Sequence, residues 1–229
     1  MSARTRILDA AMLVFRRHGF RRSSIEQAAE AAGLTRQALY HHFKSKEELF
    51  RAVIERLYEN ALATEIAAAN AAEKAGGSLA DILVAQLSWR LRLAITSLEG
   101  SPHIEELFSE HLVQGRDLYQ KYAGLYDAQV IATIERVCRN QRLVLAPGIT
   151  SRDLSRYVVM AINGTKSAYP AMQPVDAFLK DLEIMLRTLV GGAVAAPKPP
   201  SIKSRSIKPR SIKPKPAKKS ARPKPGDRK

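Results

Sequence analysis

Apolar residues recur at helical spacing from Arg4 to about Gly192, and proline and glycine fall in the joints between the helical stretches. No sustained alternation of apolar and polar residues indicates a β-sheet, so the pattern predicts an all-α fold. The first stretch shows the spacing well, because its apolar residues fall at i, i+3, i+4, i+7 and i+8 and stop before Gly19. They are Ile7, Ala10, Ala11, Val14 and Phe15.

Capping signals predict where the next helices begin. Ser23 followed by Glu26 has the pattern of a capping box, in which two side chains satisfy free backbone N–H groups at a helix start. Gly33 breaks this second helix, and Thr35 is placed to cap a third helix that runs to about His42. The buried face of the second helix is expected at Ile25, Ala28, Ala29 and Ala32.

A second capping box, Ser45 with Glu48, opens a long fourth helix. Its expected buried residues are Leu49, Val53, Leu57 and Ala61. Five more helices are expected beyond Gly76, and the one from Leu79 is apolar on most sides, so it should run through the middle of the body. The predicted ranges are 79–97, 103–113, 116–140, 152–168 and 175–191.

The net charge of +15 is concentrated at the two ends of the chain. Residues 197–229 hold 13 lysines and arginines against one aspartate, and residues 1–52 hold 10 basic against 5 acidic side chains. Residues 53–196 are near neutral, with 14 basic and 16 acidic side chains. Basic ends on a neutral body predict a polyanionic partner, with nucleic acid ahead of an acidic membrane surface.

The C-terminal segment has the composition of a disordered tail. Its motifs SIKSR, SIKPR and SIKPK repeat, and no apolar face is large enough to offset the cost of ordering the chain. Its positive charges would bind DNA phosphates without sequence preference, with RNA, anionic lipid or solubility alone as alternatives. The expected organisation is a basic N-terminal domain at 1–52, a helical body at 53–196 and a disordered basic tail at 197–229.

Composition argues against several other classes of protein. No apolar stretch is long enough to span a membrane, and charges run through the N-terminal segment, so we expect a cytoplasmic protein without membrane contact. Cys138 is the only cysteine, which excludes an internal disulfide and leaves a small buried side chain as the favoured interpretation over a reactive thiol.

The sequence also gives no sign of an enzyme. His103, Glu106 and His111 lack the close spacing or the cysteine partner of a metal site. No nucleophile elbow, phosphate loop or dinucleotide-binding glycine pattern is present. We therefore expect no catalytic residue, no metal and no cofactor.

Residues 32–34 join two short helices in a helix-turn-helix pattern, whose second helix enters the DNA major groove. On that helix Leu39 and Phe43 are four residues apart and must face the core. The opposite side then carries Arg36, Gln37, Tyr40 and His41.

These residue types suit a DNA duplex. Arginine can make a paired contact to guanine and glutamine a paired contact to adenine, whereas tyrosine and threonine hydroxyls more often hold phosphates. Lys46 and Ser24 lie at helix starts, where free N–H groups favour a phosphate. A solvated polar helix face has the same pattern, so the motif alone leaves both interpretations open.

About the first 55 residues resemble the N-terminal domain of the TetR family of transcriptional regulators. The resemblance is carried by the segment ILDAAMLVFRRHGFRRSSIEQAAEAAGLTRQALYHHFKSKEELF. Its matched features are Phe15-x-x-x-Gly19-Phe20, Ser23-Ser24-Ile25, Ala29-x-x-Ala32-Gly33-Leu34-Thr35, Leu39-Tyr40-x-x-Phe43 and Ser45-Lys46-x-x-Leu49. Ala28 departs from the family pattern, which usually has a large aliphatic residue there, so the packing of the second helix should be slightly looser.

The resemblance implies a function and a set of contacts. The function is that of a ligand-responsive repressor that binds a palindromic operator in double-stranded DNA as a homodimer and is released by a small-molecule effector. Base or groove contacts are implied for Arg36, Gln37 and His41, and phosphate contacts for Ser24, Thr35, Tyr40 and Lys46. The remaining helices are implied to form a ligand-binding and dimerisation domain.

The last two body helices are strongly apolar. Two such helices from each subunit would form a four-helix interface and set the recognition helices about one DNA turn apart. Alternatively, their apolar faces close the core of the monomer. The residues concerned are Leu154, Tyr157, Val158, Ala161, Ile162, Phe178, Leu182, Met185 and Leu189, with Gly164 allowing close approach.

Candidate ligand-binding residues lie on three body helices that combine apolar faces with a few polar groups, as small-molecule pockets do. Arg90 suggests an anionic or carbonyl-bearing ligand. Each residue also fits an ordinary place in the core or on the surface. The candidates are Gln86, Trp89, Arg90, Phe108, His111, Tyr119, Tyr122 and Tyr126.

The charge distribution leaves a second function open. An architectural protein that coats the nucleoid through its basic tail would show no operator preference, and it would lose DNA binding when residues 197–229 are deleted.

Overall fold

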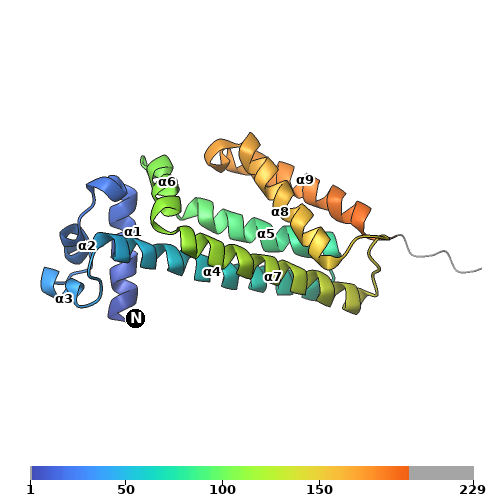
Figure 1. Ribbon diagram of the computed structural model, residues 1–229, viewed down its shortest axis with the longest axis horizontal. Helices are drawn as coiled ribbons and strands as arrows, with labels where there is room; N and C mark the ends of the chain where they lie inside the picture. Colours follow the sequence, from blue (N-terminus) through green and yellow to red (C-terminus); the bar gives the residue numbers. More distant parts are fainter. Residues whose placement is uncertain (1, 196–229) are drawn as a thin grey trace, which may run out of the picture. The chain divides into compact units, whose positions relative to one another are not determined.

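The computed structural model describes residues 2–195. Nine α-helices and one short 3-10 helix follow one another in this range (Figure 1), and their bounds are α1 Ala3–Arg22, α2 Ile25–Ala31, α3 Arg36–Tyr40, α4 Lys46–Lys74, α5 Leu79–Thr96, α6 Ile104–Gln114, α7 Arg116–Gln141, α8 Ser151–Ala168, η1 Pro170–Met172 and α9 Val175–Ala193. The predicted all-α fold is confirmed for residues 2–195, where the β-type pairing is limited to an isolated bridge between Leu145 and Val194. The tail predicted for 197–229 lies outside the described residues.

The five predicted body helices agree with the structure to within two residues at each end. α3 ends at Tyr40, two residues before the predicted end at His42. In α4, Leu49, Val53 and Ala61 are buried as expected, whereas Leu57 is only half-buried.

The start of α2 corrects one prediction. The capping residue is Ser24, whose hydroxyl accepts from the Gln27 N–H at 3.2 Å while the Gln27 side chain accepts from the Ser24 N–H at 2.8 Å. Ser23 is buried instead, and its hydroxyl donates to the carbonyl oxygen of Gly19 in α1. A pair of adjacent serines allows either register, because glutamine serves as well as glutamate in a capping box.

The start of α4 corrects a second prediction, the capping box of Ser45 and Glu48. The Ser45 hydroxyl accepts from the Glu48 N–H at 3.1 Å, as a capping box requires. The Glu48 carboxylate, however, accepts from the Lys44 N–H at 2.7 Å rather than from that of Ser45. The serine cap is therefore confirmed, and the reciprocal half of the predicted box is displaced by one residue.

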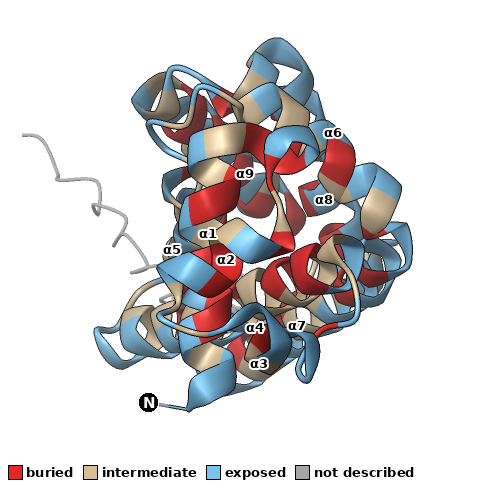
Figure 2. Cartoon of the chain, turned by 90° about the vertical axis from the view of Figure 1, so that its left-hand side faces the viewer, coloured by how far each residue is buried: buried red, intermediate tan, exposed pale blue. Residues whose placement is uncertain are grey.

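Buried apolar residues form two clusters. Figure 2 colours all buried residues red along the helices that carry them. The first cluster joins α1 to α4 and includes Leu107 of α6 and Leu118 of α7. Three phenylalanines stand at its centre, with ring centroids 4.7 to 6.1 Å apart: Phe15, Phe20 and Phe50. The second cluster is built mainly from α5, α7, α8 and α9.

Helix α4 contributes to both clusters without a break. The boundary expected between residues 52 and 53 therefore lies inside a continuous helix. The two clusters therefore share one rigid element, the helix α4.

Candidate functional site

The exposed face of α3 has the arrangement predicted from the sequence. Leu39 and Phe43 are 0% and 1% exposed and belong to the cluster formed with α1 and α4. These two side chains fix the rotation of the short helix about its axis, so its polar residues point away from the core. The residues left exposed are Thr35, Arg36, Gln37, Tyr40 and His41.

Arg36 is held on this face by neighbours on α2 and α3. Its Nε lies 2.8 Å from a carboxylate oxygen of Glu26, and its guanidinium carbon lies 5.4 Å from the centroid of the Tyr40 ring. Exposed ion pairs of this kind contribute at most about 1 kcal/mol. A DNA base could therefore replace the Glu26 contact at little cost in free energy.

Ser24 and Thr35 both cap helices with their side chains. The Thr35 hydroxyl accepts from the Ala38 N–H at 3.2 Å, and the Ser24 hydroxyl accepts from the Gln27 N–H at the same distance. A hydroxyl that accepts a hydrogen bond still has its own O–H group to donate. Each side chain can therefore donate to a phosphate oxygen without giving up its cap.

Lys46 is directed toward the protein. Its Nζ donates to the carbonyl oxygens of Phe20 at 2.9 Å and Arg21 at 3.3 Å, and lies 4.5 Å from the centroid of the Phe20 ring. The ammonium thus binds the carbonyl end of α1, where the last C=O groups have no partner within the helix. The sequence pattern did not indicate this role. The third N–H of Lys46 is left for the predicted phosphate contact.

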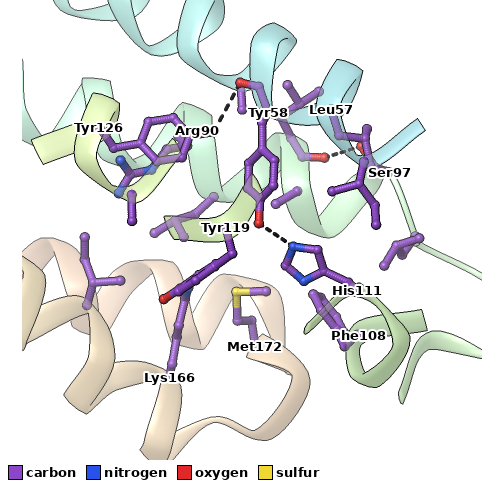
Figure 3. Close-up of a pocket in the computed structure, with 18 of the residues that line it drawn as sticks. Leu57, Tyr58, Arg90, Ser97, Phe108, His111, Tyr119, Tyr126, Lys166 and Met172 are labelled. Carbon is purple, nitrogen blue, oxygen red and sulfur yellow. Dashed lines mark hydrogen bonds between the residues drawn. The ribbon is translucent and has the colours of Figure 1, made fainter. Parts of the chain in front are cut away.

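A cavity of about 290 Å³ lies between helices α1, α4, α5, α6, α7 and α8 (Figure 3). Its wall is mostly apolar, with a few polar side chains. Five of the eight predicted ligand-binding residues line it: Arg90, Phe108, His111, Tyr119 and Tyr126. Whether they bind a ligand stays a prediction.

The other three predicted residues lie outside the cavity lining. Gln86 is fully buried and donates to Glu65 at 3.2 Å. Trp89 is 55% exposed, because it lies on a different side of α5 from Arg90. Tyr122 is buried and stacks on Tyr58 with the ring centroids 4.8 Å apart.

Five polar residues of the wall were not among the predicted candidates: Tyr58, Ser97, Asp127, Asn163 and Lys166. Tyr58 follows Leu57 on a helix face that the apolar pattern already marked as inward, which was a usable signal. A lysine in the last turn of an amphipathic helix has the pattern of an ordinary surface charge. The sequence around Lys166 therefore gave no signal that this side chain lines a cavity.

The hydroxyl of Tyr58 and Nε2 of His111 share a hydrogen bond across the cavity (Figure 3). Burial lowers the pKa of His111, and the charge of Lys166 lowers it further. Burial also raises the pKa of Tyr58. Both groups are therefore kept neutral, and the pair ties α4 to α6 by a hydrogen bond between uncharged groups.

Arg90 enters the cavity with its charge already matched. Its Nη1 lies 3.1 Å from a carboxylate oxygen of Glu65, which is 0% exposed. Burial raises the pKa of Glu65, and Arg90 opposes that change. The guanidinium also lies 4.4 Å from the ring centroid of Tyr126. One buried carboxylate and one aromatic ring thus hold the Arg90 side chain in place.

Helices α8 and α9 divide their apolar residues between the core and the surface. Most of the predicted interface residues are buried: Leu154, Val158, Ala161, Ile162, Phe178 and Leu182. Tyr157 and Met185 are exposed together with Met160 at 63% and Ile184 at 53%. Leu189 is half-buried, and Gly164 is exposed with open space around it. The pair of helices therefore closes the core and also presents an apolar outer face.

The histidines and the cysteine form no composite site in the part of the chain that is described. His103 Nδ1 lies 3.7 Å from Glu106, and no group of three or more metal-binding side chains occurs among residues 2–195. Cys138 is half-buried, and burial raises the pKa of its thiol. None of the described helices combines the length and the apolar character needed to cross a membrane.

Residues 7–53 match the family described as "Bacterial regulatory proteins, tetR family". The HTH-type transcriptional regulator UidR of Escherichia coli (strain K12) is 43% identical over 60 residues, which make up 26% of this chain and 31% of the relative. The HTH-type transcriptional regulator TtgR of Pseudomonas putida is 41% identical over 56 residues, 24% of this chain and 27% of the relative. The chain thus matches about a third or less of the length of these relatives.

Solved structures match over a much larger part of the chain. The structure of SmeT, the repressor of the Stenotrophomonas maltophilia multidrug efflux pump SmeDEF, has a TM-score of 0.58 at 21% identity and covers 85% of this chain and 92% of its own. A transcriptional regulator from Rhodococcus sp. Rha1 has a TM-score of 0.60 at 20% identity. The match covers 86% of this chain and 100% of that structure's chain. At such identities the likeness concerns the fold alone.

Proposed function

We propose that this chain, whose N-terminal domain belongs to the TetR family, is a homodimeric transcriptional repressor that leaves a palindromic operator when a small molecule enters its cavity. The observation that carries the proposal is the polar face of α3, held outward by the buried pair Leu39 and Phe43. An exposed short helix of this composition, set after a turn against α2, suits the major groove. A repressor of this kind would act in the cytoplasm, at the nucleoid.

The residues of this face divide between bases and phosphates. Arg36 and Gln37 have the paired donors and acceptors that read guanine and adenine, and His41 adds a groove contact. The remaining predicted contacts position the protein on the backbone through hydroxyls and one ammonium: Ser24, Thr35, Tyr40 and Lys46.

A second copy of the chain would cover the apolar outer face of α8 and α9. Its exposed residues are Tyr157, Met160, Ile184 and Met185. A two-fold axis through this face would pair α8 and α9 of both subunits in a four-helix interface. The two recognition helices could then reach successive major grooves, about 34–36 Å apart.

Helix α6 supplies the link between the cavity and the DNA-binding domain. His111 lines the cavity, and the preceding residue, Glu110, pairs with Arg21 at the end of α1. Glu106, one turn earlier, accepts from the Arg21 N–H at 2.8 Å. A ligand that displaces α6 would therefore displace the end of α1 and, with it, the start of α2. Effector and operator would thus bind to different arrangements of the same helices.

Glu106 also packs directly against Gly19. The backbone of Gly19 has φ 76°, and a Cβ there would clash with the Glu106 carboxylate. Glycine is suited to both conditions, because it adopts positive φ freely and has no side chain. The contact between α1 and α6 therefore depends on the backbone conformation of Gly19 as well as on the side chains of Arg21, Glu106 and Glu110.

Fluorescence anisotropy with the promoter DNA next to the protein's own gene tests the proposal. We expect binding that prefers this DNA over an unrelated duplex and that survives deletion of residues 197–229. Arg36→Ala should weaken it by about 1–3 kcal/mol, the value of one paired base contact. Arg92→Ala, which removes an exposed arginine of α5, is the matched control and should leave binding unchanged.

The opposite pattern would support the architectural alternative. If the protein binds unrelated DNA equally well and loses its binding only when residues 197–229 are deleted, the repressor proposal is wrong.

A further inference from the structure

We propose that the molecule that enters the cavity is apolar with one anionic end, and that the Lys166 ammonium holds that end. This inference rests on the proposed function only for the claim that the ligand is an effector. It names the chemical class of the ligand, which the fold and the family leave open.

The wall of the cavity selects an apolar body for the ligand. Aliphatic and aromatic side chains from six helices line it, among them Phe15, Leu57, Leu91, Phe108, Val130 and Ile162. Apolar surface of this kind favours a ligand that is itself removed from water on binding. A strongly polar metabolite would lose its hydration in the cavity without gaining enough hydrogen bonds in return.

An arginine and a lysine reach the cavity, and they differ in one respect. Arg90 is paired with the buried carboxylate of Glu65 at 3.1 Å. Among residues 2–195, no carboxylate lies within 4.0 Å of the Lys166 ammonium. The unmatched positive charge of the cavity is therefore that of Lys166.

The other titratable groups of the wall do not match this charge. Asp127 accepts a hydrogen bond from Ser155 at 2.5 Å. Ser155 and Lys166 both lie on α8, separated by about 16 Å of helix at 1.5 Å of rise per residue. His111 is kept neutral by its lowered pKa, and the phenols of Tyr58 and Tyr126 remain protonated because burial raises their pKa values. The lining also includes Tyr119, and among the described residues Asp127 is its one carboxylate.

Lys166 is placed to receive a ligand. Its side chain is one of those that line the cavity and extends into it from α8 in Figure 3, although the residue as a whole is exposed. The protein atoms around the ammonium lower its pKa, and Arg90 adds to the effect. Both influences are unfavourable to an unpaired cation, and an anion placed beside it would relieve them. A neutral ligand would not, and a cationic ligand would be repelled.

Isothermal titration calorimetry of the full chain at pH 7 with three probes that each carry a ten-carbon chain tests the inference. The probes are decanoate, 1-decanol and decyltrimethylammonium, which share an apolar chain and differ in the charge of the head group. We expect decanoate to bind at least tenfold more tightly than 1-decanol, and the cation to bind more weakly than either.

Variants of Lys166 assign the difference to one side chain. Lys166→Met should lower the affinity for decanoate at least tenfold and leave that for 1-decanol unchanged, which also shows that the cavity remains folded. Lys166→Arg should restore most of the decanoate affinity. Lys180→Met, at an exposed lysine of α9 outside the cavity, is the matched control and should behave as the unmodified chain.

Three results would overturn the inference: no measurable binding of decanoate, equal or tighter binding of 1-decanol or of the cation, or an unchanged decanoate affinity in Lys166→Met. None of these measurements contains DNA. Failure of the repressor proposal appears separately, as the absence of operator preference in the anisotropy experiment, and leaves the ligand class standing.

Discussion

Arg21 at the end of α1 pairs with Glu110 of α6 at 3.0 Å, one residue before His111 in the wall of the cavity. The Glu110 side chain is only 10% exposed, and it also accepts from Gln114 at 3.3 Å. One turn of α6 therefore carries both a contact to the end of α1 and a residue of the cavity wall.

Glu110→Gln should weaken the link between ligand and DNA. The variant keeps the size of the side chain and loses its charge, so operator affinity without ligand should change by less than about threefold, while the effect of decanoate on it should shrink. Allosteric couplings are typically about 1–3 kcal/mol, which sets the size of the loss that anisotropy titrations would measure. Glu105→Gln, at an exposed position of the same helix, is the control. An unchanged response in Glu110→Gln would show that α6 acts through other contacts.

Leu39→Ala and Gln37→Ala should separate folding from recognition on α3. Leu39 is fully buried, so its truncation should lower the free energy of unfolding by about 2–5 kcal/mol and weaken DNA binding as a consequence. Gln37 is exposed, so its truncation should weaken operator binding and leave stability within about 0.5 kcal/mol. Urea unfolding followed by circular dichroism, with anisotropy on the same samples, measures both. The assignment of the two faces fails if the stability losses are reversed.

Lys46→Met should reduce stability as well as DNA affinity. The variant loses two hydrogen bonds from an ammonium to the end of α1, and we expect a decrease of about 1–2 kcal/mol in the free energy of unfolding. Lys44→Met removes the side chain of an exposed lysine two residues away and should leave stability unchanged. Denaturant titrations compare the free energies of unfolding of the two variants. Equal values would contradict a stabilising role of Lys46 and leave DNA binding as its only function.

Stability should fall in acid partly through Asp81. Hydrogen bonds from Ser78 and Arg187 lower the pKa of Asp81 to about 2. Its pKa in the unfolded chain is about 3.9, so the carboxylate stabilises the fold above about pH 4, and this contribution is lost as the pH falls through about 2.

Asp81→Asn should therefore lower stability at pH 7 and flatten its dependence on pH between about 4 and 2. The side chains of Asp81 and Arg187 are each 44% exposed, so the effect should be about 1 kcal/mol or less. Arg187→Gln removes the second partner and should reduce the same pH dependence. Thermal unfolding measured from pH 2 to pH 7 is the test, and a wild-type pH profile in both variants would contradict it.

Met160→Glu combined with Ile184→Glu should abolish the proposed dimer. Both residues are exposed on the outer face of α8 and α9, so a charge there is tolerated in the monomer and is unfavourable in an apolar interface. Light scattering after size-exclusion chromatography should give the mass of one chain, and operator affinity should fall with it. Leu112→Glu, at an exposed leucine of α6, should leave the mass unchanged. A double variant that stays dimeric would place the interface elsewhere.

The sequence by itself determined the helices and the orientation of α3. Helical periodicity and capping depend on residues within about four positions of one another, so the spacing of Leu39 and Phe43 was enough to predict which side of α3 is exposed. For the same reason the body helices were predicted to within two residues.

Only the tertiary structure decided which polar groups meet. Trp89 and Arg90 are neighbours in the chain, but one is exposed and the other lines the cavity, because packing selects the side of α5 that faces inward. Lys46 turns toward a carbonyl group 26 residues away, and Tyr58 meets His111 across 53 residues. Lys166 of α8 lines the same cavity as Tyr58 and His111. Such contacts depend on how whole helices pack, and no local pattern of residues encodes that arrangement.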